Sequence, residues 1–178
     1  MKILLIETAT RVCSVALAVD GKIVALRECS ELDAHSTRLP LFLKELIANQ
    51  CIDAVCVSSG PGSYTGLRIG VSSAKGLCYG YGQPLLSVPT LLSMTALYYM
   101  QHPEYKGLVC PMIDARRMEC YTMMVDSQLN ILRDTQADVI SEGIYDEWLG
   151  RGEGMFIGDG AAKTRPLLGV YPHARYDD

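Results

Sequence analysis

Runs of apolar residues near the N-terminus predict three short strands. Residues 3–6 are continuously apolar, residues 13–19 are small, β-branched and apolar, and Asp20-Gly21 is a hairpin signal before residues 23–26. This order is typical of a β-meander. The same buried-strand pattern returns twice further along the chain, and we expect two more strands at residues 54–57 and 85–88.

A helix is predicted over residues 36–50, with Ser36 or Thr37 as its cap and Pro40 tolerated in its first turn. At about 100° per residue, most of its apolar side chains share one broad face. Leu41 and Ala48 fall on the opposite face. A single exposed leucine needs no explanation in a soluble protein, so the meaning of these two positions stays open.

Two more helices are expected, at residues 65–79 and at residues 90–100. The first of them is rich in glycine, and each interior glycine costs about 1 kcal/mol relative to alanine. Such a helix needs a compensating reason. Its small residues allow another backbone to approach closely, either from the same chain or from a partner, and we place on one stripe Gly66, Gly70, Ser73 and Ala74.

The three-strand pattern recurs in the second half of the chain. An acidic residue closes an apolar strand at Glu7 and again at Asp114, and a turn follows each after a similar interval, at Asp20 and Asp126. With a helix-ending His102-Pro103 between the copies, we expect lobes at residues 1–103 and 104–178. The predicted fold is α/β, with duplicated βββαβα lobes like those of actin, sugar kinases and heat-shock ATPases.

The composition narrows the class of protein. The 178 residues are 49% hydrophobic and 20% charged, which is ordinary for a globular chain and excludes disorder, collagen and coiled coil. A formal charge of −4 offers no general attraction for nucleic acid, so contact with RNA would be local or made through a partner. Seven scattered cysteines and no long apolar run predict free thiols in a cytoplasmic protein without a membrane span.

The actin-like architecture raises the hypothesis of an ATPase, because the first hairpin of each lobe holds phosphates in that superfamily. A phosphate cradle needs glycine where the backbone meets the anion. The first hairpin has Ala9 at that place, and residues 114–117 contain no glycine. Both cradles therefore look filled, although residues 158–160 (Gly-Asp-Gly) could be either a remaining phosphate site or a simple turn.

Residues 59–68 (Ser-Gly-Pro-Gly-Ser-Tyr-Thr-Gly-Leu-Arg) form a glycine-rich segment between a strand and a helix. The Walker spacing fails there, because Leu67 stands where lysine is required. A nucleophile elbow fails as well, since the glycines around Ser63 are each one residue too far away. The segment is then either an anion-binding elbow or a purely structural turn.

Other catalytic groups are sparse. His35, His102 and His173 lie far apart in sequence and form no metal-binding motif, and we expect His35 to be a capping or surface residue. Asp114 and Glu119 could act as an acid–base pair or simply as an ion-paired surface patch. No catalytic residue, metal ligand or cofactor site is predicted.

Several motifs resemble one family. They are residues 6–17 (Ile-Glu-Thr-Ala-Thr-Arg-Val-Cys-Ser-Val-Ala-Leu), residues 60–70 (Gly-Pro-Gly-Ser-Tyr-Thr-Gly-Leu-Arg-Ile-Gly) and residues 113–121 (Ile-Asp-Ala-Arg-Arg-Met-Glu-Cys-Tyr). The sequence resembles the TsaB (YeaZ) family over residues 3 to about 125. The long glycine motif is the most specific of the three.

The resemblance implies an actin-like subunit without catalysis of its own. It would form a heterodimer with TsaD and work with TsaE in making threonylcarbamoyladenosine at position 37 of tRNAs that read codons beginning with A. Contact with tRNA would be indirect, and a homodimer through the same helices is plausible without TsaD.

Partners of this family dock on two helices of the first lobe. Carried onto this chain, that implies an interface of Leu41, Ala48, Gly66, Gly70, Ser73 and Ala74. Gly70→Leu would then block TsaD binding and leave the isolated fold cooperative.

One departure from the family concerns length. Its members usually continue for several tens of residues, with a C-terminal segment that packs back on the first lobe. We therefore expect the second lobe, residues 104–178, to be incomplete. Two enzyme readings remain as alternatives: an ATP-binding enzyme of the actin-like superfamily, and a glycoprotease, for which the chain offers neither metal motif nor nucleophile.

Overall fold

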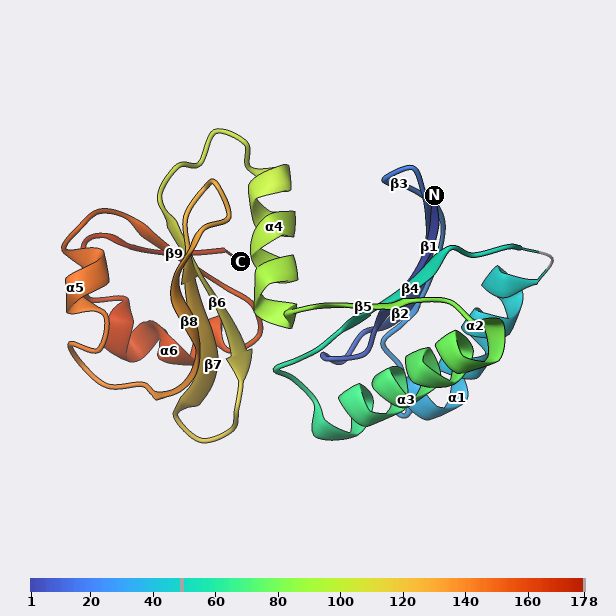
Figure 1. Cartoon of the computed structure of the whole chain (residues 1–178). Helices are drawn as coiled ribbons and strands as arrows, with labels where there is room; N and C mark the ends of the chain where they lie inside the picture. Colours follow the sequence, from blue (N-terminus) through green and yellow to red (C-terminus); the bar gives the residue numbers. More distant parts are fainter. Residues whose placement is uncertain (49, 178) are drawn as a thin grey trace. The chain divides into compact units, whose positions relative to one another are not determined.

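The computed structural model describes residues 1–48 and 50–177 and divides the chain into two compact units. The first unit is Met1–Thr90 and the second is Leu91–Asp178. Each unit is built on a five-stranded sheet with helices packed against it (Figure 1).

The first sheet has the strand order β3-β2-β1-β4-β5. The β1–β2 and β2–β3 pairs are antiparallel, whereas β4 joins β1 and β5 joins β4 in parallel. All five predicted strands are confirmed, with bounds β1 Lys2–Glu7, β2 Cys13–Val19, β3 Lys22–Cys29, β4 Ala54–Ser58 and β5 Leu85–Val88. The predicted meander therefore supplies β1, β2 and β3 of a five-stranded mixed sheet.

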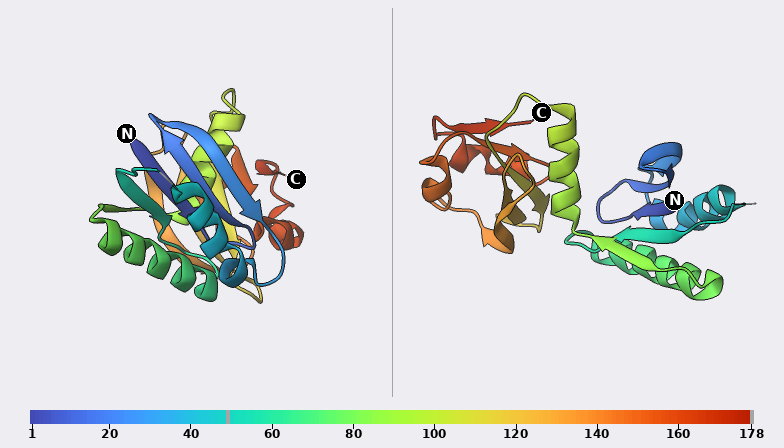
Figure 2. Two further views of the ribbon diagram at one scale, coloured as in Figure 1. Left: turned by 90° about the vertical axis from the view of Figure 1, so that its right-hand side faces the viewer. Right: turned by 45° about the horizontal axis from the view of Figure 1, so that its top comes forward.

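Three helices of the first unit lie on one face of this sheet, as the turned view of Figure 2 shows. They are α1 (Ala34–Thr37), α2 (Leu39–Ile47) and α3 (Tyr64–Tyr81). Their apolar side chains share one core with the strands, and its fully buried members include Leu4, Val15, Leu39, Val55 and Ala74.

The helix predicted over residues 36–50 is in fact two helices. The hydroxyls of Ser36 and Thr37 donate to the carbonyl of Asp33, so neither residue caps the longer helix, which begins after Arg38. Pro40 lies at the start of α2, as expected. The helix ends at Ile47, and residue 49 of the prediction lies outside the described residues.

The second sheet repeats the first. Its order is β10-β9-β6-β7-β8, so that β6 to β10 take the places of β1 to β5, with the same parallel and antiparallel pairs. The strands are β6 Leu108–Asp114, β7 Glu119–Val125, β8 Ile131–Val139, β9 Gly154–Ile157 and β10 Ala174–Tyr176. The duplicated α/β architecture is confirmed, and the incomplete second lobe of the prediction has all five strands of its sheet.

Helices cover both faces of the second sheet. One face carries α5 (Asp146–Leu149) and α6 (Ala161–Leu168), whose core includes Met112, Tyr145 and Phe156. The other face carries α4 (Thr90–Gln101), where Leu91 packs on Ile113, Met123 and Val125.

The position of α4 moves the boundary between the two parts of the chain. The sequence predicts a boundary between residues 103 and 104, whereas the compact units meet at Thr90 and Leu91. The reason is packing: Leu91 and Tyr98 on α4 are buried against strands of the second sheet. The helix expected to end the first lobe therefore belongs to the second unit.

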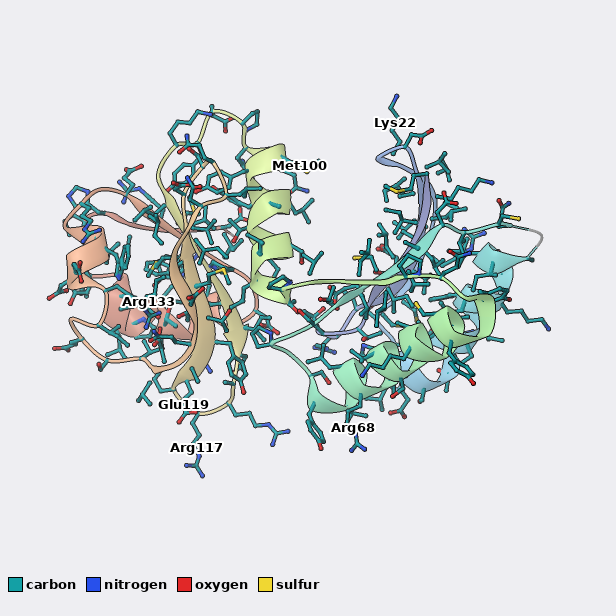
Figure 3. The ribbon with its side chains drawn as sticks, in the orientation of Figure 1. Lys22, Arg68, Met100, Arg117, Glu119 and Arg133 are labelled. Carbon is teal, nitrogen blue, oxygen red and sulfur yellow. The ribbon has the colours of Figure 1, made fainter. Side chains whose placement is uncertain are left out.

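The buried carboxylate of Asp138 on β8 ties this strand to β7 and to Tyr145. Arg133 donates to both carboxylate oxygens of Asp138, and Thr122 and Tyr145 donate to the same carboxylate. Arg133 is labelled on β8 in Figure 3. Burial opposes the charge on Asp138, but the bonds from Arg133, Thr122 and Tyr145 together lower its pKa.

We predict that Asp138→Asn destabilises the second unit by about 3 kcal/mol, because it leaves the half-buried Arg133 guanidinium without its counter-ion. Urea unfolding, with hydrogen exchange of β7 and β8, measures the loss. Glu147→Gln is the control, since it breaks an exposed pair with Arg151 and should change nothing measurable. Equal stability of the two variants would contradict the role of the network.

The same group predicts a pH dependence. Because the pKa of Asp138 is lower in the folded chain than the ordinary value of 3.8, its stabilisation is complete above that pH. It is lost as the pH falls further and the folded carboxylate takes up a proton. Acid unfolding of the native chain should therefore be steeper below pH 3.8 than that of Asp138→Asn.

Candidate functional site

An open groove lies between α2 and α3 of the first unit. It has a volume of about 670 Å³ and is lined mainly by apolar and small residues of the two helices. Its lining residues are Pro40, Leu43, Lys44, Ile47, Ala48, Ser73, Gly76, Leu77 and Tyr81. We call it the α2–α3 groove.

The groove follows from the amphipathic pattern of α2. Leu39, Leu43 and Leu46 are buried, with Leu43 also in the groove wall, and the side of the helix opposite these residues is open to solvent. Leu41 is 55% exposed on that side, as the helical periodicity predicts. Ala48 is exposed at the end of α2 and lines the groove, whereas Leu41 lies outside it.

The four small residues that we expect on one stripe of α3 do not all face the same side of the helix. Gly66, Gly70 and Ala74 are buried against the chain's own fold, so they are not available to a partner in this conformation. A Cβ at Gly66 would lie 2.1 Å from the carbonyl oxygen of Thr8, and one at Gly70 would lie 2.1 Å from the Thr8 hydroxyl. We therefore expect Gly70→Leu to destabilise the first unit itself.

The open side of α3 carries other small residues. Ser73 is half-buried and lines the groove, as does the exposed Gly76. A Cβ at Gly76 or Gly80 would meet no atom within 4 Å. The signal for Gly76 is present in the sequence, because it lies three residues after Ser73 and therefore on the same side of a helix.

We predict opposite effects of alanine at the two kinds of glycine. Gly70→Ala should lower the free energy of unfolding by about 1–3 kcal/mol through overpacking against Thr8. Gly76→Ala should raise it by up to about 1 kcal/mol, because it adds helix propensity in open space. Hydrogen exchange of α3 and β1 in the full chain measures both, and a stabilising Gly70→Ala would contradict the packing described.

The glycine-rich loop before α3 packs directly on the first hairpin. A Cβ at Gly62 would lie 2.3 Å from the carbonyl oxygen of Ala9, and the Ser63 N–H donates to that oxygen at 2.6 Å. Ser63 Oγ also accepts from Gly66 N–H and caps α3. These amides are engaged within the chain, so the loop serves as a structural turn at this point.

Glu7 holds the same hairpin from the other end. Its carboxylate accepts from the N–H of Ala9 at 2.6 Å and from the hydroxyl of Ser58 at 2.8 Å. Ser58 ends β4, the parallel neighbour of β1. The acidic residue that closes the first strand therefore fixes the turn and is not free for chemistry.

The second hairpin is closed in a related way. The Lys163 ammonium donates to the Asp114 carboxylate and to the carbonyls of Arg117 and Glu119, which fills the inside of the turn with a cation. Asp159 accepts from the Asp114 N–H, so the Gly-Asp-Gly segment also serves the fold. A Cβ at Gly160 would lie 3.1 Å from the same Asp114 nitrogen.

The proposed acid–base pair of Asp114 and Glu119 is not supported by this geometry. The hydrogen bond from Lys163 holds the pKa of Asp114 below its ordinary value, which keeps the group ionised and unable to donate a proton near neutral pH. Glu119 is half-buried, and the bond from Lys163 goes to its backbone carbonyl. Figure 3 shows Arg117 reaching away from the tip of this hairpin.

The histidines stay apart. His35 is a half-buried residue of α1, and His102 stacks on Tyr98 with ring centroids 4.4 Å apart. Within residues 1–48 and 50–177, no three His, Cys, Asp or Glu side chains come together as metal ligands. All seven cysteines are free thiols.

Two sheets of matching strand order, each with a first hairpin closed by a glycine-containing loop, define a duplicated actin-like α/β protein. A family model described as "TsaD: tRNA N6-adenosine threonylcarbamoyltransferase" matches residues 31–148. The chain belongs to this family, and within it to the TsaB (YeaZ) proteins.

Individual relatives support that assignment. The tRNA threonylcarbamoyladenosine biosynthesis protein TsaB of Escherichia coli is 36% identical over 126 residues, covering 68% of this chain and 53% of the relative. The Bacillus subtilis TsaB is 31% identical over 143 residues, with coverage of 78% and 61%. The chain thus spans a little more than half the length of these relatives.

The solved structure of YeaZ from Pseudomonas aeruginosa shares the fold. It superposes with a TM-score of 0.79 at 24% identity, covering 99% of this chain and 83% of that one. The actin-like fold predicted from the repeat is therefore confirmed.

Proposed function

We propose that this chain is a non-catalytic subunit that binds and supports a TsaD transferase, together with TsaE, in the threonylcarbamoylation of adenosine 37 of tRNAs that read codons beginning with A. Relatives at 31–36% identity are named for threonylcarbamoyladenosine biosynthesis, which supports the pathway. The subunit role rests on the surface and hairpins of the first unit.

The observation that carries the proposal is the α2–α3 groove. An open, largely apolar groove with small residues on its walls suits a helix of another protein, because glycine and serine let two backbones approach closely. Ala48 and Ser73, two of the expected interface residues, line it. Leu41 is exposed on the same helix but lies outside the groove.

The closed hairpins support a subunit without catalysis or cofactor. Ala9 and Gly62 are in close contact where an actin-like ATPase would admit a phosphate. Lys163 and Asp114 fill the second hairpin with a neutral pair. A chain arranged in this way leaves nucleotide and metal chemistry to its partners.

The charge supports an indirect role toward RNA. With a net charge of −4, the chain lacks the basic field by which proteins neutralise phosphates, so we assign direct tRNA contact to the partner. No described helix has the length and apolar character needed to cross a bilayer. We propose that the chain acts in the cytoplasm and forms a homodimer through α2 and α3 when TsaD is absent.

We predict that Gly76→Arg weakens binding to the TsaD of the same organism at least about tenfold, equivalent to about 1.4 kcal/mol, because a long cation then occupies the α2–α3 groove. Tyr79→Arg is the matched control, because it places the same cation at an exposed position of α3 that does not line the groove. Titration calorimetry measures binding, and threonylcarbamoyl transfer to tRNA with TsaE present measures activity.

Circular dichroism of both variants shows that the fold is kept. Loss of binding in Gly76→Arg alone supports the groove as the docking site. Equal binding by the wild-type chain and both variants would overturn this assignment. A wild-type chain that neither binds TsaD nor supports transfer would overturn the proposed function itself.

The ATP-binding alternative makes a different prediction. If the hairpins are closed as described, calorimetry of the isolated chain with ATP and Mg²⁺ should give no binding heat at millimolar nucleotide. Saturable binding of ATP would favour an enzyme of the actin-like superfamily and would require the contact between Ala9 and Gly62 to open.

A further inference from the structure

Two cysteines of the first unit face each other across neighbouring strands. Cys13 is the first residue of β2 and Cys29 is the last of β3, and the antiparallel register places them directly opposite. Opposite residues of such a pair have Cα atoms about 4.5–5.5 Å apart. A disulfide spans Cα separations of about 4.4–6.8 Å, so the sheet already holds the two residues at bonding separation.

The two thiols have different environments. Cys13 is fully buried in the core of the first unit, and this burial, with a smaller effect of Cys29, raises its pKa to about 11. Cys29 is half-buried at the edge of the same core, and the Glu31 N–H donates to its sulfur at 3.5 Å. Cys29 is therefore the member of the pair that a small oxidant reaches.

A cation stands near Cys29. Arg38 pairs with Glu31 at 3.0 Å. The pKa of Arg38 is raised mainly by Glu31 and further by Cys29, which places the guanidinium within electrostatic reach of the sulfur. The thiolate is the form of a cysteine that attacks peroxides.

We propose that Cys29 and Cys13 form a reversible dithiol–disulfide pair that is oxidised by hydroperoxides. This site is independent of TsaD binding and of the proposed function. Among the described residues of both sheets, these two are the cysteines that register pairing sets directly opposite each other.

The chemistry balances in two steps with hydrogen peroxide as the oxidant. The Cys29 thiolate attacks one oxygen, the O–O bond breaks, and hydroxide leaves while Cys29 becomes a sulfenic acid. The Cys13 sulfur then attacks the sulfenic sulfur, the S–S bond forms, and the S–O bond breaks to release water. Two thiols and one peroxide give one disulfide and two waters, and a small dithiol reductant reverses the change.

The test treats the reduced full chain with an equimolar amount of hydrogen peroxide, blocks the remaining thiols with an alkylating agent and digests the product with trypsin. Cleavage at the flanking basic residues separates the two cysteines into peptides 12–22 and 28–38. We expect mass spectrometry to find these peptides linked, with the loss of two hydrogens, and released again by dithiothreitol.

Three variants identify the roles. Cys13→Ser should stop at a sulfenic acid on Cys29 that dimedone traps, whereas Cys29→Ser should form neither product. Cys51→Ser is the matched control, because Cys51 is exposed elsewhere in the same unit and should not affect the link. Circular dichroism verifies that each variant is folded.

The proposal is overturned if peptides 12–22 and 28–38 remain unlinked in the folded wild-type chain. It is also overturned if peroxide is consumed as fast in Cys29→Ser as in the wild type, or if Cys51→Ser abolishes the link. In that last case the disulfide would form by exchange through Cys51 and not by direct oxidation of Cys29.

Discussion

The close approach of a glycine-containing loop to the first hairpin is the contact on which the arrangement of each unit depends. In the first unit, Gly62 and Gly66 bring the loop and the start of α3 against Ala9 and Thr8, where a Cβ would overlap backbone atoms. In the second unit, Gly158 approaches the carbonyl of Met112, which lies within β6 before its hairpin. Each contact joins the first strand of a sheet to the segment after its fourth strand.

This contact also decides what the hairpins can do. A hairpin that binds phosphate must keep its amides free and its inner side open. Here the Ala9 N–H donates to the Glu7 carboxylate, and the Ser63 N–H donates to the Ala9 carbonyl. In the second unit Lys163 occupies the corresponding turn. The Ala9 amide, the Glu7 carboxylate and the Asp114 carboxylate are thus bonded within the chain, whereas the buried hydroxyl of Thr8 has no hydrogen-bond partner.

The sequence predicts the sheets better than the helical surfaces. The five strands of the first sheet contain short apolar runs bounded by turn residues, and the repeat of Glu7 and Asp114 reflects a real equivalence between β1 and β6. The boundary between the units is missed because the apolar pattern of α4 shows that it is buried but not against which sheet. Leu91 packs against Ile113 in the core of the second unit, and this contact is visible only in the folded structure.

The glycines of α3 show the same limit at the level of single residues. Small residues occur on two sides of this helix, and periodicity alone does not say which side meets the sheet. The position of Thr8 decides it, because the short distance from its carbonyl to α3 requires Gly66 to face inward. The interface expected at Gly66, Gly70 and Ala74 is thereby assigned to the core, whereas Ser73 remains at the surface.

Gly76 and Gly80 differ from the buried glycines, because no contact within the chain requires glycine at these positions. Each costs about 1 kcal/mol of helix stability relative to alanine, and the described fold gives nothing in return, since a Cβ at either position would meet no neighbouring atom. Gly66 and Gly70, by contrast, are required by the contact with Thr8. This loss of helix stability has an explanation if the backbone of a partner packs against the open side of α3. Because Gly76 lines the α2–α3 groove and Gly80 does not, the first of them is where that approach should be closest.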